Sequence, residues 1–341
     1  MVAALVLVTV VAVTYNVRAA RNETAATTTT TSTTIASGTC PEGSPITCYS
    51  LTRTLKDGDK GADVRRLQQR LKDLKFDPGY VDGVFGGDTM MAVWAFQGLV
   101  MNRTADTKSD NFTPYMWDVM RGNVSITPRR QPGTPRHVEV YLPEQVLALF
   151  EGPTLLLVSH ISSGTGKKWC EPVIVDPGEE GNENGKEPIE MGVCGEAITP
   201  SGIYYFYNRK YGTRESKLGT MWNPVYFNYG IAIHGAMEVP KYPASHGCVR
   251  IPNFISAYFP AMVKYNDRVY VFDGVKDPEE YGSPPPIFDK KDPNYTTTTS
   301  STSTTVPKTT VPKSTVPKTT VPKTTVPKAT TTTTSTSTVP G

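Results

Sequence analysis

The sequence is poor in histidine and has an odd number of cysteines. Its N-terminal apolar run is shorter than a helix needs to cross a membrane. Of its 341 residues, four are histidine and five are cysteine. The apolar run at residues 2–15 would cover roughly 21 Å as a helix, whereas a bilayer core is about 30 Å thick. We therefore interpret residues 1–20 as a secretory signal.

The charges around this run leave a second interpretation open. No Lys or Arg precedes it, whereas Arg18 and Arg21 follow it, which is the wrong order for an export signal. If the true start lies upstream, the segment would be a longer, uncleaved membrane anchor. An internal apolar helix is a further alternative.

Positive charge is scarce before the C-terminal repeats. The net charge is +3, but five of the 35 basic residues are lysines that lie beyond residue 296, where there are no acids. The preceding residues carry a net charge of −2. Their charge is not that of a nucleic-acid-binding protein, and we expect no nucleic-acid partner.

Both ends of the chain lack apolar periodicity. Residues 21–39 are rich in threonine, and near the C-terminus Val-Pro-Lys recurs at Val306, Val311, Val316, Val321 and Val326. Such segments bury too little apolar surface to offset the entropy of folding. We expect a disordered linker at residues 21–39 and a disordered tail at residues 275–341. The tail lysines either attract an anionic envelope polymer or simply keep the tail solvated.

Residues 40–122 carry apolar residues at helical spacing. Val64, Leu67, Leu71 and Leu74 form one stripe, and Val93, Phe96 and Val100 form another. Thr113 followed by Pro114 is typical of a helix start, and the helix that follows is expected to bury Trp117. These patterns alone predict a small helical bundle.

The spacing of several residues in this bundle is similar to a known family. Gly58, Gly61, Leu67-Gln68, Asp82-Gly83, Phe85-Gly86, Phe96-Gln97 and Trp117 together resemble the three-helix peptidoglycan-binding domain of bacterial cell-wall enzymes. The resemblance implies binding to the glycan and stem peptides of peptidoglycan. A helical spacer without a ligand is the alternative.

Residues 136–274 read as a second, β-rich domain. A junction rich in proline, glycine and charge precedes it at residues 123–136. Short runs such as HVEVYL, QVLALFE and DRVYVFDG are rich in β-branched and aromatic residues, which predicts strands with antiparallel pairing. One helix is expected at residues 253–263, with Pro260 as a residue that is unfavourable in its interior.

The cysteines allow several pairings, and the sequence does not choose among them. Pairing Cys40 with Cys48 and Cys170 with Cys194 would contribute roughly 2.6 and 3.5 kcal/mol in the chain-entropy model. Both bonds would suit an exported protein. This local pairing leaves Cys248 free.

Cys248 lies near two of the four histidines, His234 and His246. A thiol of ordinary pKa is a poor nucleophile at neutral pH, so catalysis by cysteine needs a base or a cation nearby. Gly247 would let the backbone approach a substrate, and successive amides there would stabilise an oxyanion. Structural zinc would need a fourth ligand at a matching spacing, so we expect no metal and no cofactor.

Three motifs around these residues occur together and in order. Ile-His-Gly ends at Gly235, Ser-His-Gly-Cys-Val-Arg spans residues 245–250, and Thr-Pro-Ser-Gly begins at Thr199. This set resembles the L,D-transpeptidase catalytic domain. The resemblance implies a mainly-β, sandwich-like domain in which Cys248 is the acylated nucleophile and His234 is its base.

The resemblance also implies roles for the neighbouring residues. The Gly235 carbonyl would orient His234, the amides of Gly247 and Cys248 would form the oxyanion hole, and Arg250 would order the motif or contact substrate. Two groups complete the expected site: Ser245 and His246, which would shape the pocket, and Trp222, Tyr226 and Tyr242, which either line it or pack in the core.

The implied reaction is peptidoglycan cross-linking outside the cytoplasm, in the bacterial cell envelope. The thiolate would attack a stem tetrapeptide, D-alanine would leave, and the amine of another stem would resolve the thioester. An L,D-carboxypeptidase, in which water resolves the same acyl-enzyme, and a non-catalytic peptidoglycan-binding protein are the alternatives. Residues 170–194 look like an insertion that either caps the donor site or forms a surface loop. Asn-x-Ser/Thr triplets begin at Asn22, Asn102, Asn123 and Asn294, which would suit a secreted eukaryotic glycoprotein. The resemblance to bacterial wall proteins makes that interpretation the weaker one.

Overall fold

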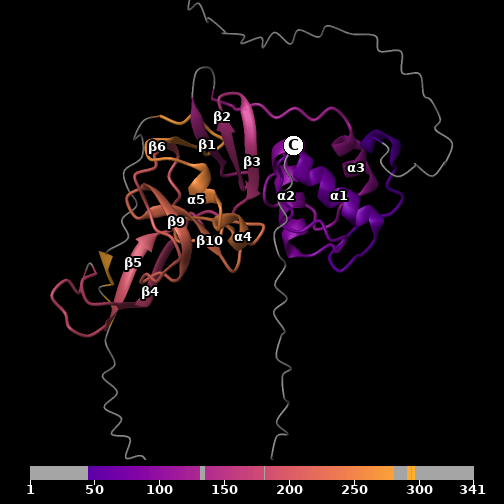
Figure 1. Cartoon of the computed structure of the whole chain (residues 1–341). Helices are drawn as coiled ribbons and strands as arrows, with labels where there is room; N and C mark the ends of the chain where they lie inside the picture. Colours follow the sequence, from indigo (N-terminus) through magenta and orange to yellow (C-terminus); the bar gives the residue numbers. More distant parts are fainter. Residues whose placement is uncertain (1–44, 131–134, 180, 280–289, 293, 296–341) are drawn as a thin grey trace, which may run out of the picture. The chain divides into compact units, whose positions relative to one another are not determined.

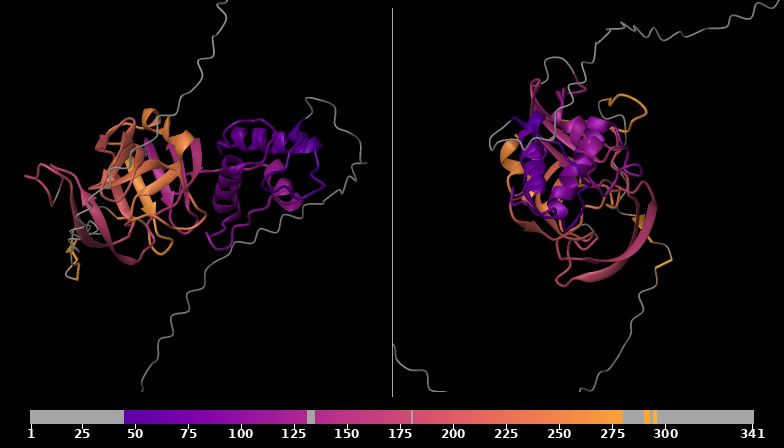
Figure 2. Two further views of the ribbon diagram at one scale, coloured as in Figure 1. Left: turned by 90° about the horizontal axis from the view of Figure 1, so that it is seen from below. Right: turned by 90° about the vertical axis from the view of Figure 1, so that its right-hand side faces the viewer.

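A helical domain is followed by a mainly-β domain (Figure 1 and Figure 2), which confirms the predicted fold class. The structure is a computed structural model that describes residues 45–130, 135–179, 181–279, 290–292 and 294–295. The predicted signal or anchor, the threonine-rich linker and Cys40 lie outside the described residues. Within those residues, no helix has the length and apolar character needed to span a membrane.

Within the described residues, the helical domain consists of three α-helices and one short 3-10 helix. They are η1 (Ile46–Cys48), α1 (Ala62–Asp73), α2 (Gly87–Met101) and α3 (Pro114–Arg121). The predicted apolar stripes supply fully buried core residues, including Val64, Leu67, Leu71, Val93 and Phe96. As predicted, the Thr113 hydroxyl caps α3 by accepting a hydrogen bond from the Met116 N–H at 3.3 Å. Trp117 of the same helix is buried.

The β domain contains two five-stranded sheets. Sheet A has the order β3-β2-β1-β12-β6, made of β1 (Arg136–Tyr141), β2 (Val146–Glu151), β3 (Thr154–His160), β6 (Gly202–Tyr205) and β12 (Arg268–Phe272). Sheet B has the order β11-β10-β9-β7, with β8 also on β9; its strands are β7 (Asn208–Arg209), β8 (Thr213–Arg214), β9 (Met221–Asn228), β10 (Ile231–Ala236) and β11 (Val249–Pro252). Apolar side chains from both sheets share one core.

Sheet A is buried on both of its faces. Val140 and Leu149 belong to the core shared with sheet B, whereas Tyr141, Val146 and Phe150 belong to the core of the helical domain. This double burial explains why β2 reads as the continuous apolar run Val-Leu-Ala-Leu-Phe instead of alternating with polar residues. The helical domain and the β domain are therefore joined by a common apolar core.

The expectation of antiparallel pairing was wrong for two strand pairs. β1 pairs with β12 and β10 pairs with β11 in parallel. Parallel neighbours need a crossover connection, and between β10 and β11 residues 237–248 provide it. Alternation within a strand carries no information about the direction of its partner, so the sequence could not reveal these pairs.

The single helix expected at residues 253–263 was also wrong. Two short helices occupy this stretch, α4 (Asn253–Ser256) and α5 (Phe259–Met262). Pro260 lies in the first turn of α5. Its missing N–H and its ring are incompatible with a helix interior but are tolerated in a first turn, so the chain starts a new helix there.

Residues 170–194, which the sequence suggested to be an insertion that caps the donor site or forms a surface loop, lie in a β-hairpin. β4 (Lys168–Val175) and β5 (Ile189–Glu196) pair in antiparallel fashion, and β13 (Lys290–Lys291) adds a third strand on β5. The prediction of disorder was therefore wrong for β13. The expected Cys170–Cys194 disulfide is confirmed, and Cys48 is also disulfide-bonded.

Helix α2 packs closely against the start of β2 at Gly98. A Cβ at this position would lie 2.6 Å from Val146 Cγ2 and 3.0 Å from the Glu144 carbonyl oxygen. Gly87, in the first turn of the same helix, has no atom within 4 Å of its would-be Cβ. The two glycines therefore provide a matched pair for testing whether this contact is tight.

We predict that Gly98→Ala destabilises the protein by about 1–3 kcal/mol, because overpacking outweighs the gain in helix propensity. The melting temperature of the folded chain should fall by several degrees in scanning calorimetry. Gly87→Ala, the control, should leave it unchanged or slightly raised. Equal melting temperatures for the two variants would contradict a tight α2–sheet A contact.

Candidate active site

His234 and Cys248 reach the same face of sheet B from adjacent strands. In the parallel ladder Ile233 pairs with Val249, and His234 pairs with Arg250. Side chains alternate between the two faces of a sheet. Because Ile233 and Val249 point into the core, His234, Arg250 and Cys248, which directly precedes β11, project from the opposite face.

The imidazole of His234 is buried and held by its neighbour. Nδ1 lies 2.9 Å from the Gly235 carbonyl oxygen, the partner that the resemblance implied. A carbonyl only accepts hydrogen bonds, so Nδ1 donates and Nε2 keeps its lone pair. Burial, reinforced by the Arg250 cation, lowers the pKa of His234 to about 4. At neutral pH the ring is therefore an uncharged base.

Close packing explains the glycine after this histidine. A Cβ on Gly235 would lie 2.2 Å from Ser256 Oγ and 2.6 Å from Asn253 Oδ1, both on α4. Any larger residue would push α4 away from β10 or displace the carbonyl that holds His234. Packing against α4 thus requires a glycine at position 235.

Cys248 carries a free, partly buried thiol. Its Sγ lies 3.8 Å from the Gly230 carbonyl oxygen, at the turn before β10. Burial raises the pKa of this thiol, while the Ala232 N–H and the cations Arg250 and Arg214 act in the opposite direction. The thiol is therefore mainly protonated at neutral pH, and it would need to lose its proton to act as a nucleophile.

The turn at residues 245–248 is fixed by side-chain hydrogen bonds. The Ser245 hydroxyl donates to the Cys248 carbonyl oxygen at 2.5 Å and accepts from the Gly247 N–H at 3.0 Å. Thr199 Oγ1 donates to the Gly247 carbonyl oxygen at 2.6 Å. Gly247 has a φ of +138°, which favours glycine. Because its N–H is engaged by Ser245, a role for that amide in an oxyanion hole stays a prediction and would require this bond to open.

The three aromatic residues considered for the site differ in position. Tyr226 is buried and packs with Ala232 in the cluster that Cys248 also contacts. Trp222 is half-buried on β9, opposite Gly235. Tyr242 is 61% exposed, and its carbonyl accepts a hydrogen bond from Ser162. The structure thus brings Tyr226 to the thiol, whereas the Tyr242 ring faces solvent.

Sequence reasoning missed several residues near the thiol. The Arg214 cation acts to lower the pKa of Cys248. Burial raises the pKa of Tyr207, and its neighbours Tyr226 and Cys248 act in the same direction. Trp169 and Glu171 of β4 contact His246. No local signal marks these side chains, because they reach the site only through long-range strand pairing.

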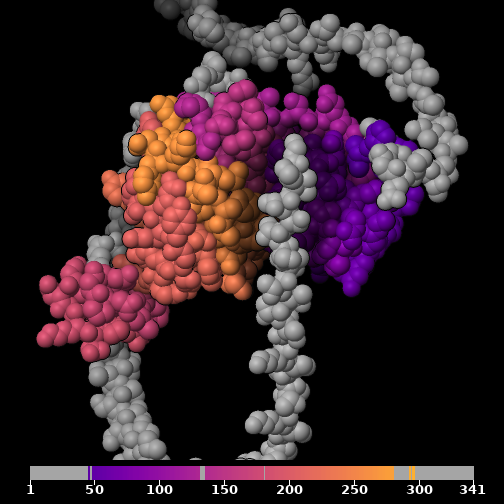
Figure 3. Space-filling view, in the orientation of Figure 1, coloured from indigo at the N-terminus to yellow at the C-terminus, as the bar shows by residue number. Residues whose placement is uncertain are grey.

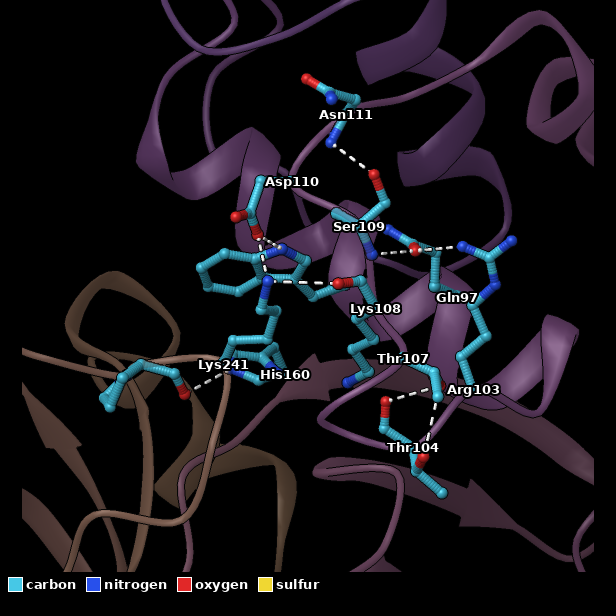
Figure 4. A network of polar contacts seen from close by, with 12 residues as sticks. Gln97, Arg103, Thr104, Thr107, Lys108, Ser109, Asp110, Asn111, His160 and Lys241 are labelled. Atoms are coloured by element: carbon cyan, nitrogen blue, oxygen red, sulfur yellow. Dashed lines mark hydrogen bonds and ion pairs between the residues drawn. The ribbon is translucent and has the colours of Figure 1, made fainter.

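The helical domain holds the loop that joins His234 to Cys248 (Figure 4). Lys241 Nζ donates to Asp110 Oδ1 at 2.7 Å and to the Lys108 carbonyl oxygen at 3.1 Å. His160 Nε2 lies 3.0 Å from the Pro240 carbonyl oxygen, and Trp94 Nε1 donates to Asp110 at 3.1 Å. The loop that leads to Cys248 is thus anchored on the segment after α2, through Lys108 and Asp110, and on β3, through His160.

Comparison with protein families agrees with both resemblances. Residues 135–271 match the family model described as the L,D-transpeptidase catalytic domain. Residues 60–111 match a model described as a peptidoglycan binding domain. No protein of curated function matches the chain.

The chain is also similar to solved structures. An L,D-transpeptidase from Xylanimonas cellulosilytica is 29% identical, with a TM-score of 0.53, and the match covers 66% of this chain and 100% of the other. An L,D-transpeptidase from Stackebrandtia nassauensis is 19% identical, with a TM-score of 0.33, over 69% of this chain and 100% of the other. The protein described here therefore carries an L,D-transpeptidase catalytic domain at residues 135–271, preceded by a peptidoglycan-binding domain at residues 60–111.

Proposed function

We propose that the protein cross-links peptidoglycan by L,D-transpeptidation, through a thioester between Cys248 and a stem tetrapeptide. One observation carries the proposal: a free thiol and an uncharged imidazole project from the same face of two paired strands. The catalytic-domain family supports peptidoglycan cross-linking in general. The substrate also places the reaction outside the cytoplasm, and the helical domain would hold the enzyme on the wall.

In the acylation step, Cys248 Sγ attacks the carbonyl carbon that links the third-position diamino acid to D-alanine. The thiol proton passes to His234 Nε2. The carbon–nitrogen bond then breaks, and the imidazolium returns this proton to the amine of the departing D-alanine. The products of this half-reaction are a thioester and free D-alanine.

In the second step, the side-chain amine of another stem peptide attacks the thioester. His234 takes a proton from that amine and passes it to the sulfur as the carbon–sulfur bond breaks. The new amide links two third-position residues, and the free thiol is restored. Each step uses the same base, and the net reaction needs no cofactor.

The charges around the thiol favour a coupled proton transfer. The low pKa of His234 and the raised pKa of Cys248 disfavour a resting imidazolium–thiolate pair. The cations Arg250 and Arg214 would stabilise negative charge as it develops on sulfur during the attack. We propose that the amides of Gly247 and Cys248 receive the oxyanion.

We predict that Cys248→Ala lowers cross-linking of purified stem tetrapeptides by at least about 1,000-fold, because it removes the nucleophile. The assay would separate cross-linked dimers from monomers by chromatography. The melting temperature should stay close to that of the wild type, which would show that the loss is chemical. If the folded variant still formed dimers at the wild-type rate, the assignment of Cys248 would be wrong.

We also predict an acidic limb near pH 4 in the rate of acylation. His234 acts as a base in its uncharged form, so activity is present above its lowered pKa and is lost as the pH falls through about 4. Circular dichroism at each pH would confirm that the protein stays folded. A limb near pH 6.5, the usual value for histidine, would contradict a buried, uncharged base.

His234→Ala is the matching variant for this profile. It should slow acylation by roughly 10²–10⁴-fold, the usual contribution of a general base. It should also remove the limb near pH 4. A variant that lost activity but kept that limb would show that another group causes it.

A further inference from the structure

The β4–β5 hairpin contacts the nucleophile turn through His246. The ring of His246 packs edge-on against the Trp169 ring, with 4.6 Å between the ring centroids. His246 Nε2 lies 3.3 Å from Glu171 Oε1. The hairpin, which Figure 3 shows projecting from the β domain at the lower left, is thus attached at its base to the residue two positions before Cys248.

The disulfide lies at the point where the hairpin makes these contacts. Trp169 and Glu171 are two residues apart on β4 and so share one face of the strand. Cys170 lies between them on the other face and is bonded to Cys194, its direct partner in the ladder. The covalent link therefore fixes the backbone of β4 at the position that presents both side chains to His246.

The turn before Cys248 is held from two directions. Ser245 and Thr199 fix its backbone through hydrogen bonds to Gly247 and Cys248. None of these bonds restrains the His246 ring, which is only partly buried. The contacts that Trp169 and Glu171 make with this ring supply the missing restraint.

We propose that Trp169 and Glu171 are positioning residues that fix the His246 ring beside Cys248, and that the Cys170–Cys194 disulfide keeps them in place. The held ring forms one side of the surface that receives the stem peptide. The effect on peptide acylation rests on the proposed function, whereas the contact with His246 does not.

The two contacts should differ in how strongly their loss slows peptide acylation. The Glu171 side chain is 51% exposed, and water screens its attraction to His246. We expect Glu171→Ala to slow peptide acylation about threefold and Glu171→Gln, which keeps an acceptor oxygen, to restore most of the rate. Trp169 supplies the packing surface, so Trp169→Ala should cost about tenfold or more. Trp169→Phe keeps an aromatic ring and should recover part of that loss.

Two further variants complete the set. Glu187→Ala removes the same charge from the same hairpin but lies beyond the end of the β4–β5 ladder, so it should leave the rate unchanged. The double variant Cys170→Ser/Cys194→Ser tests the disulfide and keeps Cys248 as the nucleophile. We expect it to slow peptide acylation by an amount between the effects of Glu171→Ala and Trp169→Ala.

Two rates would be measured on the full chain for each variant. The first is acylation of Cys248 by a stem tetrapeptide, and the second is its alkylation by iodoacetamide, which needs no peptide-binding surface. A positioning role predicts that peptide acylation falls much more than alkylation. Equal losses in both rates would mean that the variants damage the thiol itself and would overturn the proposal. Unchanged peptide acylation in Trp169→Ala would also overturn it.

A spectroscopic readout separates this inference from the proposed function. With four histidines in the chain, the ring nitrogen signals of His246 can be assigned by NMR. They should shift in Glu171→Ala and Trp169→Ala but not in Glu187→Ala. If they shift while the wild type is not acylated by peptide, the contact holds and the transpeptidase proposal fails. If they do not shift, the positioning proposal is wrong whatever the activity.

Discussion

The parallel pairing of β10 with β11 is the constraint on which the site depends. It aligns His234 with Arg250 and places Cys248 at the start of the neighbouring strand. Ile233 and Val249 alternate with these residues along the two strands and fill the core. His234, Cys248 and Arg250 must therefore share the other face of the sheet. A slip of one residue in either strand would turn its functional side chain into the core, so burial of the apolar face protects the chemistry as well as the fold.

The loop that completes this pairing is restrained by distant parts of the chain. The helical domain holds its middle through Lys241, and the disulfide-linked hairpin contacts its end at His246. Ser245 and Thr199 fix the backbone in between. An otherwise irregular segment is therefore restrained just before Cys248, and the helical domain contributes to holding it.

Local signals in the sequence predicted much of this architecture. The Thr113 cap, the apolar stripe through Leu67 and the strand runs depend on neighbours in the chain, and the structure confirms them. The parallel pairs, the hairpin at residues 170–194 and the approach of Arg214 to the thiol depend on long-range packing, which no local pattern encodes. The motif spacing predicted that His234 and Cys248 belong to one site. The contact of Trp169 with His246 joins distant parts of the chain, so the sequence did not predict it.

The most direct test of the account is mass spectrometry of the intact wild-type protein after incubation with a stem tetrapeptide and an amine acceptor. We predict a transient adduct with the mass of the peptide less D-alanine, mapped to Cys248, together with a cross-linked product. A folded protein with a free thiol at Cys248 that formed no such adduct, or formed it at another residue, would contradict the account.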